Sequence, residues 1–199
     1  MGAKRRFMAR ATSRQKFPSM SALFLLGFMG SGKSAVARHL ARGLNLRLID
    51  LDAHIEARIG TSIADFFASQ GEEAFRELET EVLRALCDQK AVVSLGGGVP
   101  TRAINRDILQ SATQKGALVV YLQTAPATLA DRIRRAPGKR PLIDGDGHLD
   151  FDATRRRVEE LMAQRETFYR ECANFVVETD RLSIGEVADA IENRWKNPV

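Results

Sequence analysis

The chain has little cysteine, tryptophan or tyrosine, and it has no long apolar run. Its 199 residues include 2 cysteines, 1 tryptophan and 2 tyrosines. Two thiols, Cys87 and Cys172, are too few for a disulfide framework or a four-cysteine zinc site, so we expect a reducing, cytoplasmic environment. No stretch of about 18 apolar residues is present, which argues against a transmembrane helix. An apolar run before a small-residue cleavage site is also missing, which argues against a secretory signal.

Acidic side chains are missing from the first 20 residues. This segment carries six cations, namely Lys4, Arg5, Arg6, Arg10, Arg14 and Lys16. The whole chain has 30 basic and 25 acidic residues and a net charge of +5, so without those cations the net charge is −1. We therefore expect residues 1–20 to be a disordered basic extension, or sequence upstream of a start at Met20. A nucleic-acid-binding arm and an Arg-rich transit peptide are the alternatives.

Short apolar segments alternate with amphipathic segments from residue 22 onward. Strands are expected at 22–26, 46–50, 91–95, 117–122 and 175–179. Helices are expected at 33–43, 52–59, 126–135 and 152–172, with others opening after Ser62, Gly71 and Ser183. This alternation predicts one α/β domain over residues 21–199, a three-layer sandwich around a five-stranded parallel sheet. Ligands of such sheets bind at the carboxyl ends of the strands.

One segment, residues 136–150, shows no periodicity. It reads APGKRPLIDGDGHLD and contains two prolines and three glycines. A loop of this length in a compact domain is usually a functional lid or a disordered segment, so we expect a mobile lid here. Arg140 within it could contact the transferring phosphoryl group of a nucleotide. The alternative is a solvated loop charge.

The segment GFMGSGKS, residues 27–34, matches the phosphate-binding loop pattern in full, and it lies between an expected strand and an expected helix. Glycines allow backbone N–H groups to turn toward phosphate oxygens, and the helix N-terminus adds partial positive charge. Lys33 is expected to reach the β- and γ-phosphates, and the Ser34 hydroxyl is expected to bind Mg²⁺. The expected ATP-binding residues of this loop are Gly30, Ser31, Gly32, Lys33, Ser34 and Ala35.

Two carboxylates and three glycines end the second and third expected strands. Asp50 could hold a Mg²⁺-bound water, and Asp52 could orient or deprotonate an acceptor hydroxyl. The alternative for Asp52 is an N-cap of the helix that follows. Gly96, Gly97 and Gly98 indicate a backbone that a ligand approaches closely, with a flexible loop as the alternative.

Two arginines are candidates for binding an anionic acceptor. Arg165 occupies an inward position in the phase of Val158, Leu161, Phe168 and Cys172. A buried guanidinium is costly unless it is paired, and a planar carboxylate would fit its fork. Arg76 and Glu79 are three residues apart on one helix and could flank the same crevice. The alternatives are an Arg165 side chain that reaches solvent and an exposed Arg76–Glu79 ion pair.

Seven segments together resemble the shikimate kinase family, in the family's order and spacing between residues 21 and 195. They are GFMGSGKS, LIDLDAHIE, SIADFF, GEEAFRELE, SLGGG, KRPLI and LMAQRETFYRECA. The resemblance implies a P-loop NTPase fold like that of nucleoside monophosphate kinases, and ATP- and Mg²⁺-dependent phosphorylation of the 3-hydroxyl of shikimate. It also implies a monomer that needs neither nucleic acid nor a membrane.

The resemblance further implies a role for each matching residue. Asp52 would bind the ring hydroxyls and serve as the base, and Arg76 and Arg165 would hold the carboxylate. Glu79 would hold Arg76, Gly97 and its neighbours Gly96 and Gly98 would contact shikimate, and Asp50 would support Mg²⁺. Arg140 would contact the ATP phosphates. Arg181 would lie near the nucleotide, in a segment, TDRLSIG, that lacks the proline often found there in the family.

Other functions fit parts of the sequence. A related P-loop kinase could act on gluconate, which is also a carboxylate, or on a nucleoside monophosphate. A nucleotide-gated nucleic-acid-binding module could use the basic extension. The guanine-reading pattern Asn-Lys-x-Asp of GTPase switches is not present in the sequence.

Overall fold

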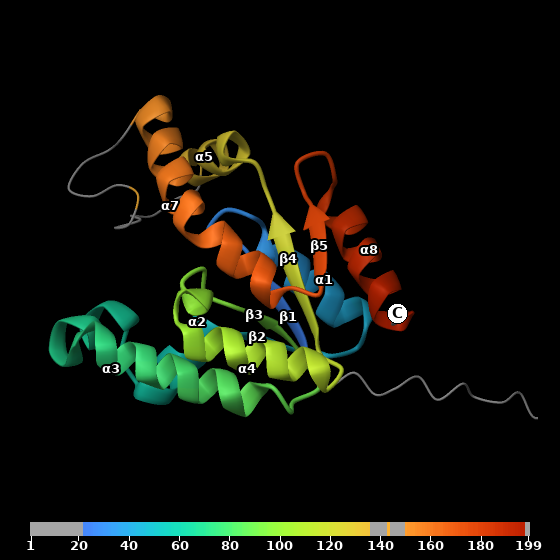
Figure 1. Cartoon of the computed structure of the whole chain (residues 1–199), viewed down its shortest axis with the longest axis horizontal. Coiled ribbons are helices and arrows are strands. Elements are labelled where there is room, and N and C mark those ends of the chain that lie inside the picture. Colours follow the sequence, from blue (N-terminus) through green and yellow to red (C-terminus); the bar gives the residue numbers. More distant parts are fainter. Residues whose placement is uncertain (1–21, 136–142, 144–149, 198–199) are drawn as a thin grey trace, which may run out of the picture.

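Five parallel strands form one sheet at the centre of the molecule (Figure 1). The computed structural model describes residues 22–135, 143 and 150–197. The sheet order is β2-β3-β1-β4-β5. The strands are β1 (Leu23–Leu26), β2 (Arg47–Asp50), β3 (Ala91–Ser94), β4 (Leu118–Gln123) and β5 (Phe175–Glu178). All four strand pairings are parallel, which confirms the predicted sheet. Residues 1–20 and Arg140 lie outside the described residues.

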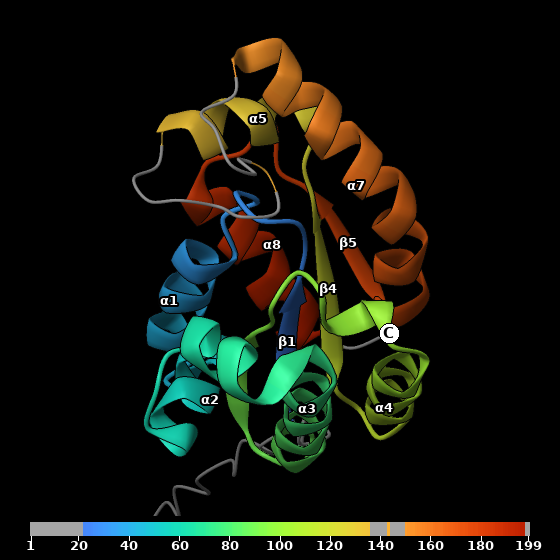
Figure 2. The same ribbon diagram turned by 90° about the vertical axis from the view of Figure 1, so that its left-hand side faces the viewer.

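Helices cover both faces of the sheet, which confirms the three-layer prediction (Figure 2). One face packs against α1 (Lys33–Gly43) and α8 (Ile184–Lys196). The other packs against α3 (Ile63–Leu86), α4 (Ala103–Gln114) and α7 (Phe151–Cys172). The remaining helices are α2 (Leu51–Ile59), α5 (Pro126–Arg135) and the short 3₁₀ helix η1 (Val99–Thr101). None of the helices in these described ranges is both long enough and apolar enough to cross a membrane.

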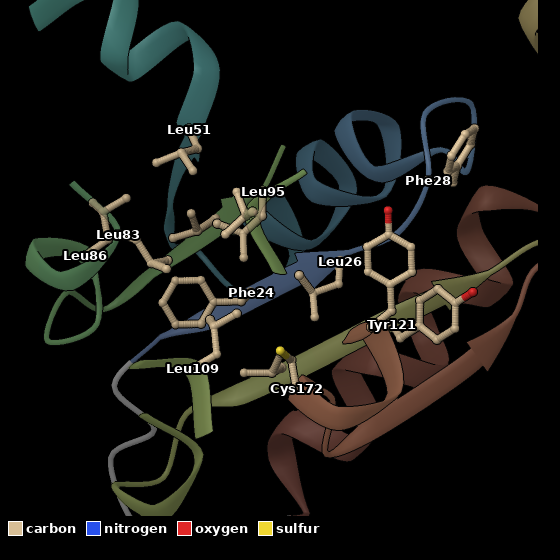
Figure 3. Close-up of a cluster of buried hydrophobic side chains, with 14 of the residues drawn as sticks. Phe24, Leu26, Phe28, Leu51, Leu83, Leu86, Leu95, Leu109, Tyr121 and Cys172 are labelled. Atoms are coloured by element: carbon tan, nitrogen blue, oxygen red, sulfur yellow. The ribbon is translucent and has the colours of Figure 1, made fainter. Parts of the chain in front are cut away.

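Successive side chains along each strand point to opposite faces of the sheet, and this divides the core into two layers. Leu23 and Leu25 of β1 point to the α1 and α8 side, and Phe24 and Leu26 point to the opposite side. This is the period-2 geometry of a strand that is buried on both faces. Figure 3 shows the second layer, where the rings of Phe24 and Tyr121 lie among aliphatic side chains from several helices.

Local signals in the sequence explain where most helices begin. Ser183 and Glu186 form a complete capping box at α8, and the Ser62 hydroxyl accepts from the Asp65 amide at 3.1 Å at α3. Asp150 caps α7, which begins at Phe151, one residue before the expected start. Gly71 adopts φ 84° and ψ 169°, which is not helical, so it separates α3 into two helical segments across a kink, as expected.

The sequence patterns did not predict α4. Its N-cap residue, Arg102, makes no side-chain capping hydrogen bond, and η1 precedes it directly. Its buried face is narrow and contains Asn105, Leu109 and Ala112. A helix without a capping residue and with a polar residue in its buried face gives a weak periodic signal.

Candidate active site

The phosphate-binding loop connects β1 to α1 at the carboxyl edge of the sheet. Gly27, Gly30 and Gly32 have φ angles of 150°, 82° and 93°. Gly32 is the N-cap of α1 and lies in the left-handed region, where a side chain would be strained. The Lys33 ammonium donates to the Gly27 carbonyl at 2.8 Å and to the Phe28 carbonyl at 2.9 Å. The loop is therefore folded around its own lysine.

Lys33 carries the main positive charge of this loop. Burial lowers its pKa to about 8, and the nearby carboxylates of Asp52 and Asp50 oppose that shift. The Ser31 hydroxyl is also buried, and it has no hydrogen-bond partner among the described residues. Phosphate oxygens would provide acceptors for both groups.

Asp50 and Asp52 lie at the end of β2 and in the first turn of α2. Asp50 is the N-cap, and one of its carboxylate oxygens accepts from the Ala53 amide at 3.4 Å. The alternative that Asp52 caps this helix is therefore wrong. Asp52 lies one residue inside the helix, and its side chain faces the cleft.

Electrostatics hold the Asp52 pKa above its ordinary value of 3.8. Desolvation is the largest cause, followed by repulsion from Asp50, while Lys33 and Arg76 act in the opposite direction. A carboxylate with a raised pKa beside a lysine is a common feature of acid–base sites. The Asp52 side chain is thus suited to accept a hydrogen bond or a proton from a hydroxyl in the cleft.

The three glycines after β3 come close to three parts of the site. A Cβ atom on Gly96 would lie 2.9 Å from Asp52 Oδ1, and one on Gly98 would lie 3.3 Å from Arg76 Nη1. A Cβ atom on Gly97 would lie 3.4 Å from the Gly27 carbonyl oxygen. Side chains here would displace Asp52 or press on Arg76. Within the described residues, the amide groups of the three glycines donate to no protein acceptor.

Arg76 is held in place by two carboxylates of α3. Its Nη1 donates to both oxygens of Glu79, at 3.2 and 3.4 Å, and its Nε and Nη2 donate to Glu72 at 3.3 and 3.2 Å. The Glu79 side chain is only 2% exposed, so the alternative of an exposed Arg76–Glu79 pair is wrong. Burial raises the Glu79 pKa, and Arg76 opposes this shift. The Arg76 guanidinium also lies 5.4 Å from the Phe75 ring centroid.

Arg165 is half-buried on the inward side of α7. It forms no ion pair with any residue that the structure describes. Its positive charge lies close enough to the Tyr169 hydroxyl, one turn further along the helix, to oppose the rise of the Tyr169 pKa. The inward position expected for Phe168 belongs instead to Tyr169, which is 1% exposed. Arg76 lies beside Gly98 and Tyr169 contacts Gly97, so both α3 and α7 reach the glycine loop.

Two adjoining cavities surround the phosphate-binding loop. The larger, of about 490 Å³, is lined by Lys33, Asp50, Asp52 and Gly97 among others. Of the described residues, neither Arg76 nor Arg165 lines it, and Arg76 lies beside Gly98. The smaller cavity, of about 270 Å³, is mostly apolar and lies over α8. Its lining includes Gly30, Gly32, Val36, Arg132, Thr179, Leu182 and Ile184.

Sequence reasoning missed Arg132 and Tyr169. Arg132 of α5 donates to the Gly30 carbonyl at 3.3 Å and lines both cavities. In the sequence it is one of several basic residues in a helix, and only its contact with the loop distinguishes it. Arg181 is exposed and lies between Thr179 and Leu182, which line the smaller cavity, but it is not part of that lining. Its contact with a nucleotide stays a prediction, as does the role of Arg140.

The fold and the site together define a P-loop kinase, with a phosphate-binding loop, two carboxylates and a glycine loop at one edge of a parallel sheet. The family model described as shikimate kinase matches residues 29–196. The chain belongs to the shikimate kinase family.

Curated relatives and solved structures agree with this assignment. A shikimate kinase of Enterococcus faecalis is 35% identical over 178 residues, covering 89% of this chain and 99% of the relative. One from Thermus thermophilus is 40% identical over 179 residues, covering 87% and 89%. A shikimate kinase from Acinetobacter baumannii, solved in complex with shikimate, has a TM-score of 0.76 and 34% identity, and the match covers 89% of this chain and 93% of that one.

Proposed function

We propose that this enzyme transfers the γ-phosphoryl group of ATP to the 3-hydroxyl of shikimate, giving shikimate 3-phosphate and ADP. The observation that supports this most is the placement of Asp52 and the glycine loop between the phosphate-binding loop and the Arg76–Glu79 pair. A carboxylic acid held by the arginines would present its ring hydroxyls to Asp52. The family and the complex of the Acinetobacter relative support shikimate as that acid.

The nucleotide half of the site is formed by the loop and the smaller cavity. Backbone amides of residues 30–35 would surround the phosphates at the N-terminus of α1. Lys33 would exchange the carbonyls of Gly27 and Phe28 for phosphate oxygens, which are stronger acceptors because they are charged. The apolar cavity over α8 would take the base, with Arg132 beside it.

A magnesium ion fits the residues next to the phosphates. Ser34 is exposed to the larger cavity, and Asp50 uses only one of its oxygens for capping, so its other oxygen is available. Hydroxyl and carboxylate oxygens are the hard ligands that Mg²⁺ prefers, and it usually keeps several waters. When bound, the ion would neutralise charge on the β- and γ-phosphates.

The chain's own residues then have distinct tasks. Arg76, fixed by buried Glu79, and Arg165 hold the carboxylate and orient the ring. Asp52 accepts the hydrogen of the attacking hydroxyl, and Lys33 stabilises the charge on the transferring group. Phosphoryl transfer needs mainly positioning and charge stabilisation, which these groups provide without a covalent intermediate. All of them belong to one chain, so we propose that a monomer is sufficient.

A panel of acceptors tests this function. ADP release is measured with shikimate, gluconate and a nucleoside monophosphate in turn, each at saturating MgATP. We expect turnover with shikimate alone. Turnover with gluconate or the nucleotide, and none with shikimate, would overturn the proposal. Gluconate is included because a gluconokinase from Sinorhizobium meliloti shares the fold, with a TM-score of 0.53 and 18% identity.

Replacing Arg165 by alanine is expected to weaken shikimate binding and leave ATP binding unchanged. A hydrogen bond between charged groups contributes about 1.5 to 3 kcal/mol, so KM for shikimate should rise roughly ten- to a hundredfold. Arg170→Ala is the matched control, because Arg170 lies on the same helix but pairs with Glu166 at the surface. An unchanged KM for shikimate in Arg165→Ala would reject the carboxylate clamp.

ATP binding is expected to weaken at alkaline pH. Lys33 is protonated below its pKa of about 8 and neutral above it, so the free enzyme loses its phosphate-binding charge as the pH rises through that value. The Kd for ATP should rise by up to about tenfold per pH unit above the pKa. Calorimetry in EDTA, from pH 7 to pH 10, measures this without a metal contribution. Lys33→Arg stays charged, so its ATP affinity should be flat over the same range.

A further inference from the structure

One hydroxyl on α7 contacts the glycine loop directly. Tyr169 is 1% exposed, and its hydroxyl donates to the Gly97 carbonyl at 2.6 Å. Gly97 itself packs against the phosphate-binding loop, since a Cβ atom there would lie 3.4 Å from the Gly27 carbonyl oxygen. The hydroxyl therefore joins the helix that carries Arg165 to the loop that separates the acceptor from the nucleotide.

This bond also fixes a neighbouring donor. The Gly97 carbonyl and the Gly98 N–H belong to one planar trans peptide, so they point in opposite directions. With its carbonyl held by Tyr169, the peptide must direct the Gly98 N–H away from α7. Gly98 is the glycine next to Arg76, and its N–H has no protein acceptor among the described residues.

The same hydroxyl lies near Arg165. The Arg165 charge lowers the Tyr169 pKa, but burial dominates and raises this pKa to about 12. The hydroxyl therefore stays protonated at neutral pH and donates to the Gly97 carbonyl. One oxygen atom thus holds the glycine loop and lies beside the second arginine.

The chain contains a natural control for this contact. Tyr121 of β4 stacks on Tyr169, with ring centroids 5.2 Å apart. Its ring is fully buried in the core cluster (Figure 3). Its hydroxyl, however, has no hydrogen-bond partner among the described residues. The two tyrosines of the chain therefore share an environment and differ in what their hydroxyls bind.

We propose that Tyr169 is a positioning residue for the acceptor, whose hydroxyl orients the Gly97–Gly98 peptide so that its N–H binds the acid. The proposal rests on the proposed function, because it assumes that this side of the cleft binds shikimate. Tyr169 acts through the glycine loop and does not contribute to nucleotide binding.

Calorimetry with two ligands and two variants tests the proposal. In Tyr169→Phe, the Kd for shikimate should rise roughly five- to tenfold, as expected for one lost hydrogen bond. The Kd for ADP should be unchanged, and Tyr121→Phe should leave both values unchanged. Two results for Tyr169→Phe would overturn the proposal. An equal rise in the Kd values for shikimate and ADP would indicate a general loss of structure. An unchanged Kd for shikimate would show that the Tyr169 hydroxyl has no role in binding the acceptor.

A second measurement does not require Tyr169→Phe to fold. In Tyr121→Phe the only tyrosine is Tyr169, so tyrosine absorption reports on its hydroxyl alone. Shikimate should perturb that absorption, and ADP alone should not. An unperturbed spectrum at saturating shikimate would count against the proposal. A wild-type enzyme that neither binds nor phosphorylates shikimate would instead refute the proposed function, which the acceptor panel identifies separately.

Discussion

Replacing Lys33 with methionine is expected to lower kcat by roughly a thousandfold, the size of effect seen when one preorganised donor to a transition state is removed. Methionine has a similar length but no charge, so the transferring phosphoryl group would lose the ammonium that lies at the centre of the loop. The carbonyls of Gly27 and Phe28 would lose their donor too. The strand before the loop and the helix after it keep their own buried packing, so the fold should survive.

Steady-state turnover and circular dichroism together measure this effect. Arg42→Met is the matched control, since Arg42 is an exposed cation in the last turn of the same helix. We expect full turnover from Arg42→Met and a native far-UV spectrum from both variants. Residual activity of Lys33→Met close to that of the control would mean that Lys33 does not contact the transferred group.

Replacing Asp52 with asparagine is expected to lower kcat by roughly a hundred- to ten-thousandfold, the range of general base catalysis. Asparagine keeps the shape and can still accept a hydrogen bond, so shikimate should bind with a smaller loss. The wild-type rate should fall as the pH drops through the Asp52 pKa, which lies above 3.8, because only the ionised form accepts the proton. That acidic limb should vanish in the variant.

Asp52→Asn should also change the alkaline side of the pH profile. Asp52 raises the pKa of Lys33, so its neutralisation should move the alkaline loss of ATP binding to lower pH. Asp189→Asn, an exposed residue of α8, is the control for charge alone. If Asp52→Asn keeps the wild-type kcat and both limbs, then Asp52 neither accepts the proton nor interacts with Lys33, and the assigned role is wrong.

The fold was largely predictable because its strands are short, apolar and bounded by glycine, proline or charged residues. Each strand lies within one residue of its expected limits. Helix α4 was missed because it lacks a capping residue and buries an asparagine. Asn105 instead donates to the Val99 carbonyl at 2.9 Å and accepts from the Thr80 hydroxyl at 2.7 Å. Such partners are distant in sequence, so no local pattern reveals them.

Site residues could be predicted from the sequence where a chemically distinctive residue follows the end of an expected strand. Lys33, Asp50, Asp52 and the glycine triplet all lie at the carboxyl edge of the sheet, as the motif positions require. Which of the two carboxylates caps α2 depends on a shift of two residues, and helix boundaries vary by one or two residues. The aromatic pair Phe168–Tyr169 posed the same problem within α7, where two adjacent positions fit the inward phase.

Arg132 was missed for a different reason. It lies in the last turn of α5 together with Arg134 and Arg135, and nothing in the sequence of that turn distinguishes one cation from the others. Its contact with Gly30 spans 102 residues of sequence. Only the packing of α5 over the loop selects it, and packing of this kind is set by the whole fold rather than by the helix.

A crystal structure with ADP, Mg²⁺ and shikimate tests the central claim most directly. Both ligands should occupy one cleft, with the carboxylate between Arg76 and Arg165 and the 3-hydroxyl turned toward Asp52 and the terminal phosphate. A shikimate molecule bound elsewhere, or one whose carboxylate contacts neither arginine, would contradict this arrangement.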